Sequence, residues 1–137
     1  MKVLFDETER LIIREWEMKD KEDLYEYASN QIVTKYLTFP TYQSIQEAVD
    51  RITYLQDCYK NGGYMQDYAI ELKKESKVIG AITIVDYNAS NEGLAEIGYC
   101  LNDKYHGNGY MTEALKGIIK YIKDNNIAKR ITAKHDV

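Results

Sequence analysis

The residues with the clearest chemical use form one short segment, His106 to Ala114, which reads His-Gly-Asn-Gly-Tyr-Met-Thr-Glu-Ala. Gly107 and Gly109 lie one residue apart, between a strand-like run that ends at Leu101 and the start of an amphipathic helix. The first backbone N–H groups of a helix have no acceptor inside it, and the helix dipole adds partial positive charge there. The segment therefore predicts a site for a phosphate or diphosphate group.

Two well-known phosphate loops fit this segment poorly. A Walker-type loop needs a glycine followed by lysine and then serine or threonine, and neither Gly107 nor Gly109 precedes a lysine. A dinucleotide-binding fingerprint needs a third glycine where Thr112 stands. That fingerprint also follows the first parallel strand of its domain, whereas an antiparallel meander is expected here. The sequence excludes the first loop and disfavours the second.

The rest of the pattern predicts the elements that hold the loop. Apolar alternation and β-branched runs favour strands over residues 11–14, 68–72, 78–85, 94–101 and 127–133. Helical periodicity favours helices over residues 21–28, 31–36, 45–59 and 111–122. Asp20 is the expected N-cap of the first, and Ser44 to Glu47 has capping-box spacing. Short turns predict antiparallel pairing, and a helix crossover predicts a parallel last pair. The expected fold class is α+β: a mixed, mostly antiparallel sheet flanked by helices.

Length and composition limit the class of protein. The 137 residues favour one domain, residues 1–137, and the 45% hydrophobic and 29% charged content is typical of a globular chain. A net charge of −4 argues against direct nucleic-acid binding, which needs an excess of lysine and arginine. Cys58 and Cys100, the only cysteines, lack disulfide-framework or zinc-site spacing, so we expect a reducing cytoplasm and no metal. We expect no signal peptide and no membrane span, because no apolar run approaches about 20 residues.

The loop resembles the acyl-coenzyme A (acyl-CoA) loop of the GNAT N-acetyltransferases. That loop has glutamine or arginine, two residues, glycine, one residue, and then glycine or alanine. Here His106, Gly109 and Met111 take the three places, and only Gly109 matches strictly. The flanking sequence is similar to the ribosomal-protein-alanine acetyltransferase branch of that superfamily over essentially the whole chain. The segments that carry this similarity are Thr8–Arg14 with Asp20 and Asp23, Val78–Gly80, Ala95–Leu101 and His106–Leu115.

The resemblance implies direct transfer of an acetyl group from acetyl-CoA to a primary amine. The acceptor would be a protein N-terminal amine, ribosomal proteins included, or a small-molecule amine. The alternative function is an acyl-CoA-binding or assembly module with this fold that has lost catalysis.

The resemblance also implies how the coenzyme is held. Backbone N–H groups of the loop would bind the diphosphate, and the backbone of Cys100 and Leu101 would pair with the pantetheine amide. His106 replaces a long polar residue of the family and would either point at the phosphate or lie on the surface. The implied coenzyme-binding residues are Cys100, Leu101, His106, Gly107, Asn108, Gly109, Tyr110, Met111 and Thr112.

Glu96 is the candidate general base, acting directly or through water. It lies in an otherwise apolar strand, where partial burial would make its carboxylate a stronger base. The alternatives are an exposed strand face or a structural ion pair, and a bulge usual in the family would change the face that Glu96 occupies. Four tyrosines are hypothesised to line an acceptor cleft: Tyr36, Tyr42, Tyr64 and Tyr99.

One departure from the family concerns the last strand. In family members this strand is followed by a further helix and two strands, for which the sequence has no counterpart up to Val137. We therefore expect the strand around Ile131 to leave an unpaired edge. A second chain, as in a homodimer, or a rearranged segment is expected to cover that edge.

Overall fold

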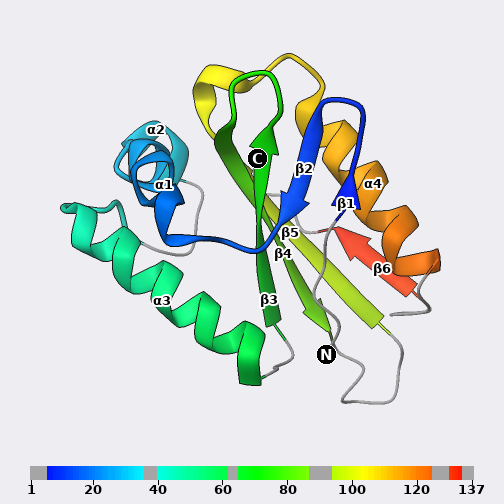
Figure 1. Cartoon of the computed structure of the whole chain (residues 1–137). Helices are drawn as coiled ribbons and strands as arrows, with labels where there is room; N and C mark the ends of the chain where they lie inside the picture. Colours follow the sequence, from blue (N-terminus) through cyan, green and yellow to red (C-terminus); the bar gives the residue numbers. More distant parts are fainter. Residues whose placement is uncertain (1–5, 36–39, 62–64, 87–93, 125–129, 134–137) are drawn as a thin grey trace.

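The computed structural model describes residues 6–35, 40–61, 65–86, 94–124 and 130–133, arranged as in Figure 1. The strands are β1 (Asp6–Glu7), β2 (Leu11–Arg14), β3 (Met65–Leu72), β4 (Lys77–Asp86), β5 (Leu94–Leu101) and β6 (Arg130–Ala133). The helices are α1 (Lys21–Ala28), α2 (Gln31–Thr34), α3 (Ile45–Asn61) and α4 (Tyr110–Asp124), with 3-10 turns η1 (Met18–Asp20) and η3 (Asp103–Tyr105). Every predicted element is present, and β1 is an addition that the sequence pattern did not reveal. Residues 36 and 127–129 of the predicted elements lie outside the described residues.

The strands form one sheet in the order β1-β2-β3-β4-β5-β6. Neighbouring strands pair antiparallel from β1 to β5, and β6 pairs parallel to β5. The expected mixed, mostly antiparallel sheet is therefore confirmed. The parallel step follows from the α4 crossover, which returns the chain to the end of the sheet where β5 begins.

The sheet contains a β-bulge, but in a different strand from the one expected. The β4–β5 pairing runs without a shift from Gly80 opposite Leu101 to Asp86 opposite Ala95. The irregularity lies between β3 and β4, where the partners change from Ile70–Gly80 to Glu71–Val78 and leave Ile79 as the extra residue. The expectation of a bulge in β5 is therefore wrong, and alternate β5 residues keep a regular in-and-out pattern.

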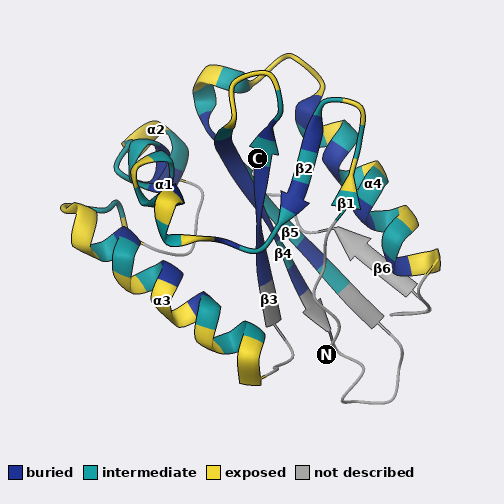
Figure 2. Ribbon diagram, in the orientation of Figure 1, coloured by how far each residue is buried: buried dark blue, intermediate teal, exposed yellow. Residues whose placement is uncertain are grey.

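Helices cover both faces of the sheet (Figure 1). On one face α4 buries a single stripe of side chains against the sheet. On the other face α1 and α3 enclose a second apolar cluster around Trp16. Figure 2 shows buried residues concentrated along the middle of the sheet and on the inner sides of these helices. The residues of the α4 stripe are Tyr110, Ala114, Ile118 and Ile122.

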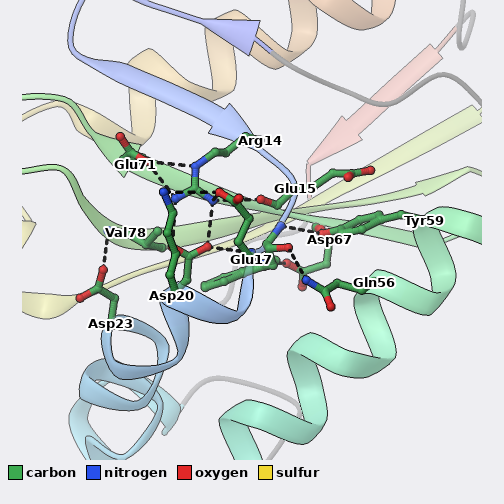
Figure 3. A network of polar contacts seen from close by, with 12 residues as sticks. Arg14, Glu15, Glu17, Asp20, Asp23, Gln56, Tyr59, Asp67, Glu71 and Val78 are labelled. Atoms are coloured by element: carbon green, nitrogen blue, oxygen red, sulfur yellow. Dashed lines mark hydrogen bonds and ion pairs between the residues drawn. The ribbon is translucent and has the colours of Figure 1, made fainter.

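Arg14, at the end of β2, holds the entrance to α1 through a network of ion pairs (Figure 3). Its guanidinium bonds both carboxylate oxygens of Asp20, at 2.8 and 3.0 Å, and reaches Glu71 of β3 at 2.8 Å. Asp20 precedes α1 as expected, but its carboxylate makes no capping bond to that helix. It accepts instead from Arg14 and from the backbone N–H of Glu17 at 2.8 Å. The residue predicted to cap α1 therefore anchors that helix to the sheet.

Among the described residues, no helix is both long enough and apolar enough to cross a bilayer.

Candidate functional site

The glycine loop leaves β5 through a fixed turn. The Asn102 backbone N–H donates to the Ile79 carbonyl at 2.7 Å, and its buried side chain donates to Glu26 at 2.6 Å and accepts from the Lys104 N–H at 3.1 Å. η3 follows, and α4 begins at Tyr110. The loop between the sheet and α4 is thus anchored at the end where it leaves β5.

Both loop glycines adopt backbone conformations that favour glycine. Gly107 has φ of 83° and Gly109 has φ of 76°, in the left-handed region that other residues rarely adopt. A Cβ at Gly107 would meet nothing within 4 Å, whereas one at Gly109 would lie 3.6 Å from Nη2 of Arg10. Both positions therefore favour glycine because of their backbone conformation. Close approach of a ligand is a second, predicted reason.

The backbone amides of residues 107–112 are unpaired within the described part of the chain. The first helical hydrogen bond is donated by Glu113 N–H to the Gly109 carbonyl, at 3.0 Å. None of the amides from Gly107 to Thr112 donates to a described acceptor. Residues 106–109 are also exposed. The N-terminus of the 15-residue helix α4 therefore offers several free donors to an anion from solvent.

The side chains of the loop turn away from these amides. The His106 ring donates through Nε2 to the Leu101 carbonyl at 3.3 Å, and Asn108 Nδ2 lies 3.3 Å from the Tyr105 carbonyl. Tyr110 is buried in the apolar cluster under α4, and Met111 packs against the same cluster. His106 is exposed, so it lies on the surface as one of the two alternatives expected, and its ring contacts the end of β5.

Arg10 and Thr8 contact this loop, and sequence analysis gave neither a role. Glu113 Oε2 accepts from Thr8 Oγ1 at 2.5 Å and from Arg10 N–H at 2.9 Å, and Arg10 Nε donates to Glu113 Oε1 at 2.6 Å. Helical periodicity places Glu113 on the side of α4 away from its apolar stripe, yet its side chain is only 18% exposed. Periodicity places a residue on a face of its own helix but does not show that a hairpin 100 residues earlier covers that face.

The end of β5 is unpaired on one side. β6 pairs only with Leu94 to Ile97, so residues 98–101 have no described strand beside them on that side, although β4 pairs with them on the other. Cys100 and Leu101 lie in this stretch, as the coenzyme prediction requires. The Cys100 thiol packs with the α1–α3 cluster, where burial, and then the nearby Asp67 charge, raises its pKa to about 12. Such a thiol stays protonated at neutral pH and is a poor nucleophile.

Glu96 lies on the same face of β5 as Cys100, because side chains two and four residues apart share a face. Glu96 is half-buried, and its carboxylate forms no ion pair or hydrogen bond with a described residue. The structural ion pair considered as an alternative is therefore absent from the described residues. An unpaired carboxylate on a partly covered face remains available for proton transfer.

Asp67, near the start of β3, is a buried carboxylate on that face that sequence analysis missed. It accepts from Trp16 Nε1 at 2.9 Å, Thr83 Oγ1 at 3.2 Å and Arg51 Nη2 at 3.3 Å. Burial raises its pKa, and the Arg51 charge and these hydrogen bonds oppose the rise. Since each oxygen has a partner, Asp67 organises the face and is not a free base.

The hypothesised tyrosine cleft is contradicted for the two tyrosines that the structure describes. Tyr42 packs against the α1–α3 cluster, whereas Tyr99 packs against the cluster under α4, on the opposite face of the sheet. Tyr36 and Tyr64 lie outside the described residues. Tyr42 and Tyr99 therefore cannot line one cleft, because the sheet lies between them. No group of three His, Cys, Asp or Glu side chains that could hold a metal ion occurs in the described ranges.

Comparison with known proteins decides the family. A family model described as the acetyltransferase (GNAT) domain matches residues 10–137. The chain belongs to the GNAT acetyltransferase family. Its relatives include an uncharacterized N-acetyltransferase, p20, from Bacillus licheniformis, which is 33% identical over 127 residues, 93% of this chain and 70% of p20. As a GNAT member whose relatives are named N-acetyltransferases, the chain is an acyltransferase.

Solved GNAT structures superpose on this one. An acetyltransferase of the GNAT family from Bacillus anthracis has a TM-score of 0.80 at 29% identity, over 95% of this chain and 72% of that chain. RimL, a ribosomal L7/L12 α-N-protein acetyltransferase solved with coenzyme A, has a TM-score of 0.79 at 19% identity, over 95% of this chain and 73% of RimL. The second similarity is one of fold.

Within this GNAT fold, the predicted residues fall into two groups. The loop from His106 to Thr112 lies at the N-terminus of α4, and the unpaired stretch of β5 with Cys100 and Leu101 leads to it. Glu96 lies further along β5, toward its start. The sequence signal for the first group was the glycine pair, and for Glu96 it was a charge in an apolar strand.

Proposed function

We propose that this GNAT acyltransferase transfers an acetyl group from acetyl-CoA directly to a primary amine, without a metal. The observation that carries the proposal is the row of unpaired amides at residues 107–112, at the N-terminus of a helix beside an unpaired strand end. A diphosphate is the part of acetyl-CoA that such amides suit. That RimL was solved with coenzyme A supports the choice of ligand for this fold.

The coenzyme is assigned to two neighbouring parts of the chain. The amides of the glycine loop bind the diphosphate, and the free side of β5 pairs with the amides of the pantetheine arm, as a strand would. An extended arm along β5 carries the thioester away from α4 and toward Glu96. The residues assigned to coenzyme binding are Cys100, Leu101, His106, Gly107, Asn108, Gly109, Tyr110, Met111 and Thr112.

The chemistry needs few protein groups. The neutral amine nitrogen attacks the thioester carbonyl carbon, the carbon–sulfur bond breaks, and the coenzyme leaves as a thiolate that takes up a proton. Glu96 accepts the proton that the amine loses, directly or through a water molecule. Holding the two substrates together supplies much of the acceleration, since good positioning lowers a barrier by roughly 7–11 kcal/mol.

The acceptor is a protein N-terminal amine or a small-molecule amine. The name of RimL supports the first class, although RimL shares only the fold with this chain. We also place the enzyme in the cytoplasm, because its two cysteines are free.

A binding and turnover experiment tests the proposal. Calorimetry compares acetyl-CoA with ATP and NAD, and we expect binding of acetyl-CoA only. Release of the coenzyme thiol is then followed with peptides that carry free N-terminal alanine or serine, and with a panel of polyamines and amino sugars. Turnover with either class supports the enzyme. Binding without release in the whole panel favours the catalytically impaired module, and no binding contradicts the proposal.

A further inference from the structure

The turn between β1 and β2 lies against the first turn of α4. Three hydrogen bonds join them, all to the carboxylate of Glu113: from the Thr8 hydroxyl at 2.5 Å, from the Arg10 N–H at 2.9 Å and from Arg10 Nε at 2.6 Å. Both carboxylate oxygens are used. The hairpin is therefore fastened to the base of the glycine loop by one charged group that is mostly covered.

The Arg10 guanidinium also contacts the loop itself. Nη1 donates to the Asn108 carbonyl at 2.9 Å, and the guanidinium carbon lies 4.6 Å from the centre of the Tyr110 ring. Nη2 lies 3.6 Å from the position that a Cβ would take on Gly109. One side chain thus contacts the two residues that flank Gly109, in the fixed fork that only arginine has.

This contact decides where one of the free amides points. In a planar trans peptide the carbonyl and the N–H of the next residue point in opposite directions. Because the Asn108 carbonyl faces Arg10, the Gly109 N–H faces away from Arg10 and from the hairpin. Arg10 therefore holds one of the proposed diphosphate donors in its outward orientation.

The contact also balances charge at the site. An anionic carboxylate in the first turn of a helix occupies the region where the helix dipole favours an anion, and it would repel a diphosphate there. Burial would raise the pKa of Glu113, but hydrogen bonds from Thr8 and Arg10 outweigh it and lower that pKa. Glu113 is thus ionised at neutral pH, and Arg10 neutralises its charge.

We propose that Arg10 is a positioning residue for the diphosphate of acetyl-CoA: it aims the Gly109 amide outward and neutralises Glu113. The inference rests on the proposed function, since it concerns the same loop. It assigns a binding role to the β1–β2 hairpin, which lies at the other end of the sequence from the loop.

The test compares Arg10→Met and Arg10→Lys with a matched control. Lys73→Met removes two contacts to the same hairpin, an ion pair with Glu7 at 2.5 Å and a hydrogen bond to the Thr8 carbonyl at 2.7 Å, and Lys73 does not contact the loop. Calorimetry gives the Kd for acetyl-CoA, thermal unfolding checks the fold, and the NMR amide signal of Gly109 is followed with inorganic pyrophosphate as the probe.

We expect Arg10→Met to raise the Kd for acetyl-CoA about tenfold and to reduce the pyrophosphate-induced shift of the Gly109 signal. Arg10→Lys restores the charge but not the fork, so we expect a Kd about threefold above wild type. Lys73→Met should leave the Kd within twofold. Adding Glu113→Gln to Arg10→Met should recover part of the affinity, because the uncompensated carboxylate is then gone.

Several results would overturn the inference. One is a folded Arg10→Met protein with the wild-type Kd for acetyl-CoA and the wild-type shift of the Gly109 signal. Another is an Arg10→Met protein whose unfolding temperature is lower while its Kd for acetyl-CoA is unchanged. If Arg10→Met does not fold, the Kd for acetyl-CoA is measured for Arg10→Lys and Glu113→Gln instead. An unchanged Kd in both variants rejects Arg10 as a positioning residue. Failure of wild type to bind acetyl-CoA would instead reject the proposed function.

Discussion

Glu96 is the residue on which the proposed proton transfer depends. It is half-buried on the face of β5 that carries Cys100, and no described residue pairs with its carboxylate. We predict that Glu96→Gln lowers kcat at pH 7 by about 100-fold, because the amide cannot accept the proton of the amine. The Kd for acetyl-CoA should stay within twofold. Steady-state turnover and calorimetry measure the two effects.

Glu22→Gln is the control for this prediction, since Glu22 is exposed on α1, far along the chain from β5. It should keep wild-type turnover. A Glu96→Gln enzyme with the same rate would remove Glu96 from the mechanism and leave water as the proton acceptor.

Cys100 is predicted to be an inert thiol. With a pKa of about 12, raised first by burial, only about one thiol in 10,000 is ionised at pH 8, and the reactive fraction rises with pH up to that value. In a Cys58→Ala protein, which leaves Cys100 as the only cysteine, alkylation by iodoacetamide at pH 8 should be about 100-fold slower than that of glutathione. Mass spectrometry of timed samples gives the rate. Alkylation as fast as that of glutathione would contradict the burial of this thiol.

Residue types alone were enough to predict the glycine loop. A positive φ favours glycine, and the pair Gly107 and Gly109 before a helix is easily recognised in the sequence. They did not identify Arg10 as a partner of that loop. Arg10 and Glu113 are 103 residues apart, and each on its own is an ordinary charged residue at the end of an element. Only the folding of the hairpin onto α4 brings them together.

At the scale of elements, β4 and β5 are joined through a close backbone contact at Gly80. A Cβ there would lie 2.4 Å from the Cys100 carbonyl oxygen, which neither strand can relieve without moving. We predict that Gly80→Ala lowers the free energy of unfolding by about 2 kcal/mol, as overpacking does elsewhere. Chemical denaturation measures it.

Gly98→Ala, in β5, is the matched control for Gly80→Ala. Its Cβ would meet only Thr83 Cβ at 3.9 Å, and alanine costs less backbone entropy in a strand than glycine. Its stability should equal or slightly exceed that of wild type. Equal stabilities for the two variants would show that β4 and β5 are not held as closely as described.

The Arg14 network is the second element-scale feature, since it joins β2, β3 and the start of α1 (Figure 3). Arg14→Met leaves the carboxylates of Asp20 and Glu71 close together, partly buried and without their cation. We predict a loss of about 3 kcal/mol in unfolding free energy. Lys19→Met, which removes an exposed pair with Glu17, should cost less than about 1 kcal/mol. A small loss for Arg14→Met would mean that another contact holds α1.

Local pattern predicted the longer elements because each strand or helix buries its own periodic face. It did not reveal β1, which has two residues and exists through its pairing with β2. It also assigned the bulge to β5, although Ile79 of β4 is the extra residue. Strand register depends on the partner strand, so a single segment carries little information about it.

For the whole molecule, we propose that one strand, β5, carries both the binding site for the pantetheine arm and the general base. β5 contributes to both faces of the sheet, because Tyr99 packs with the cluster under α4 and Cys100 packs with the α1–α3 cluster. The order of short turns and one helix crossover was enough to predict this topology. The placement of Tyr42 and Tyr99 on opposite faces was not predicted. The two residues belong to different segments, and the spacing between them does not show which face of the sheet each one occupies.

β6 is one of the two edge strands of the sheet among the described residues. We predict a homodimer formed through this edge. Light scattering at about 100 μM should give twice the mass of the 16.0 kDa chain. A monodisperse monomer at that concentration would contradict the prediction.

A crystal structure with acetyl-CoA would show whether the amides at the N-terminus of α4 bind the diphosphate. We predict diphosphate oxygens within about 3 Å of backbone amides of residues 107–112, with the pantetheine arm beside residues 98–101 of β5. A diphosphate bound elsewhere, with the Gly107 and Gly109 amides paired to protein acceptors, would contradict it.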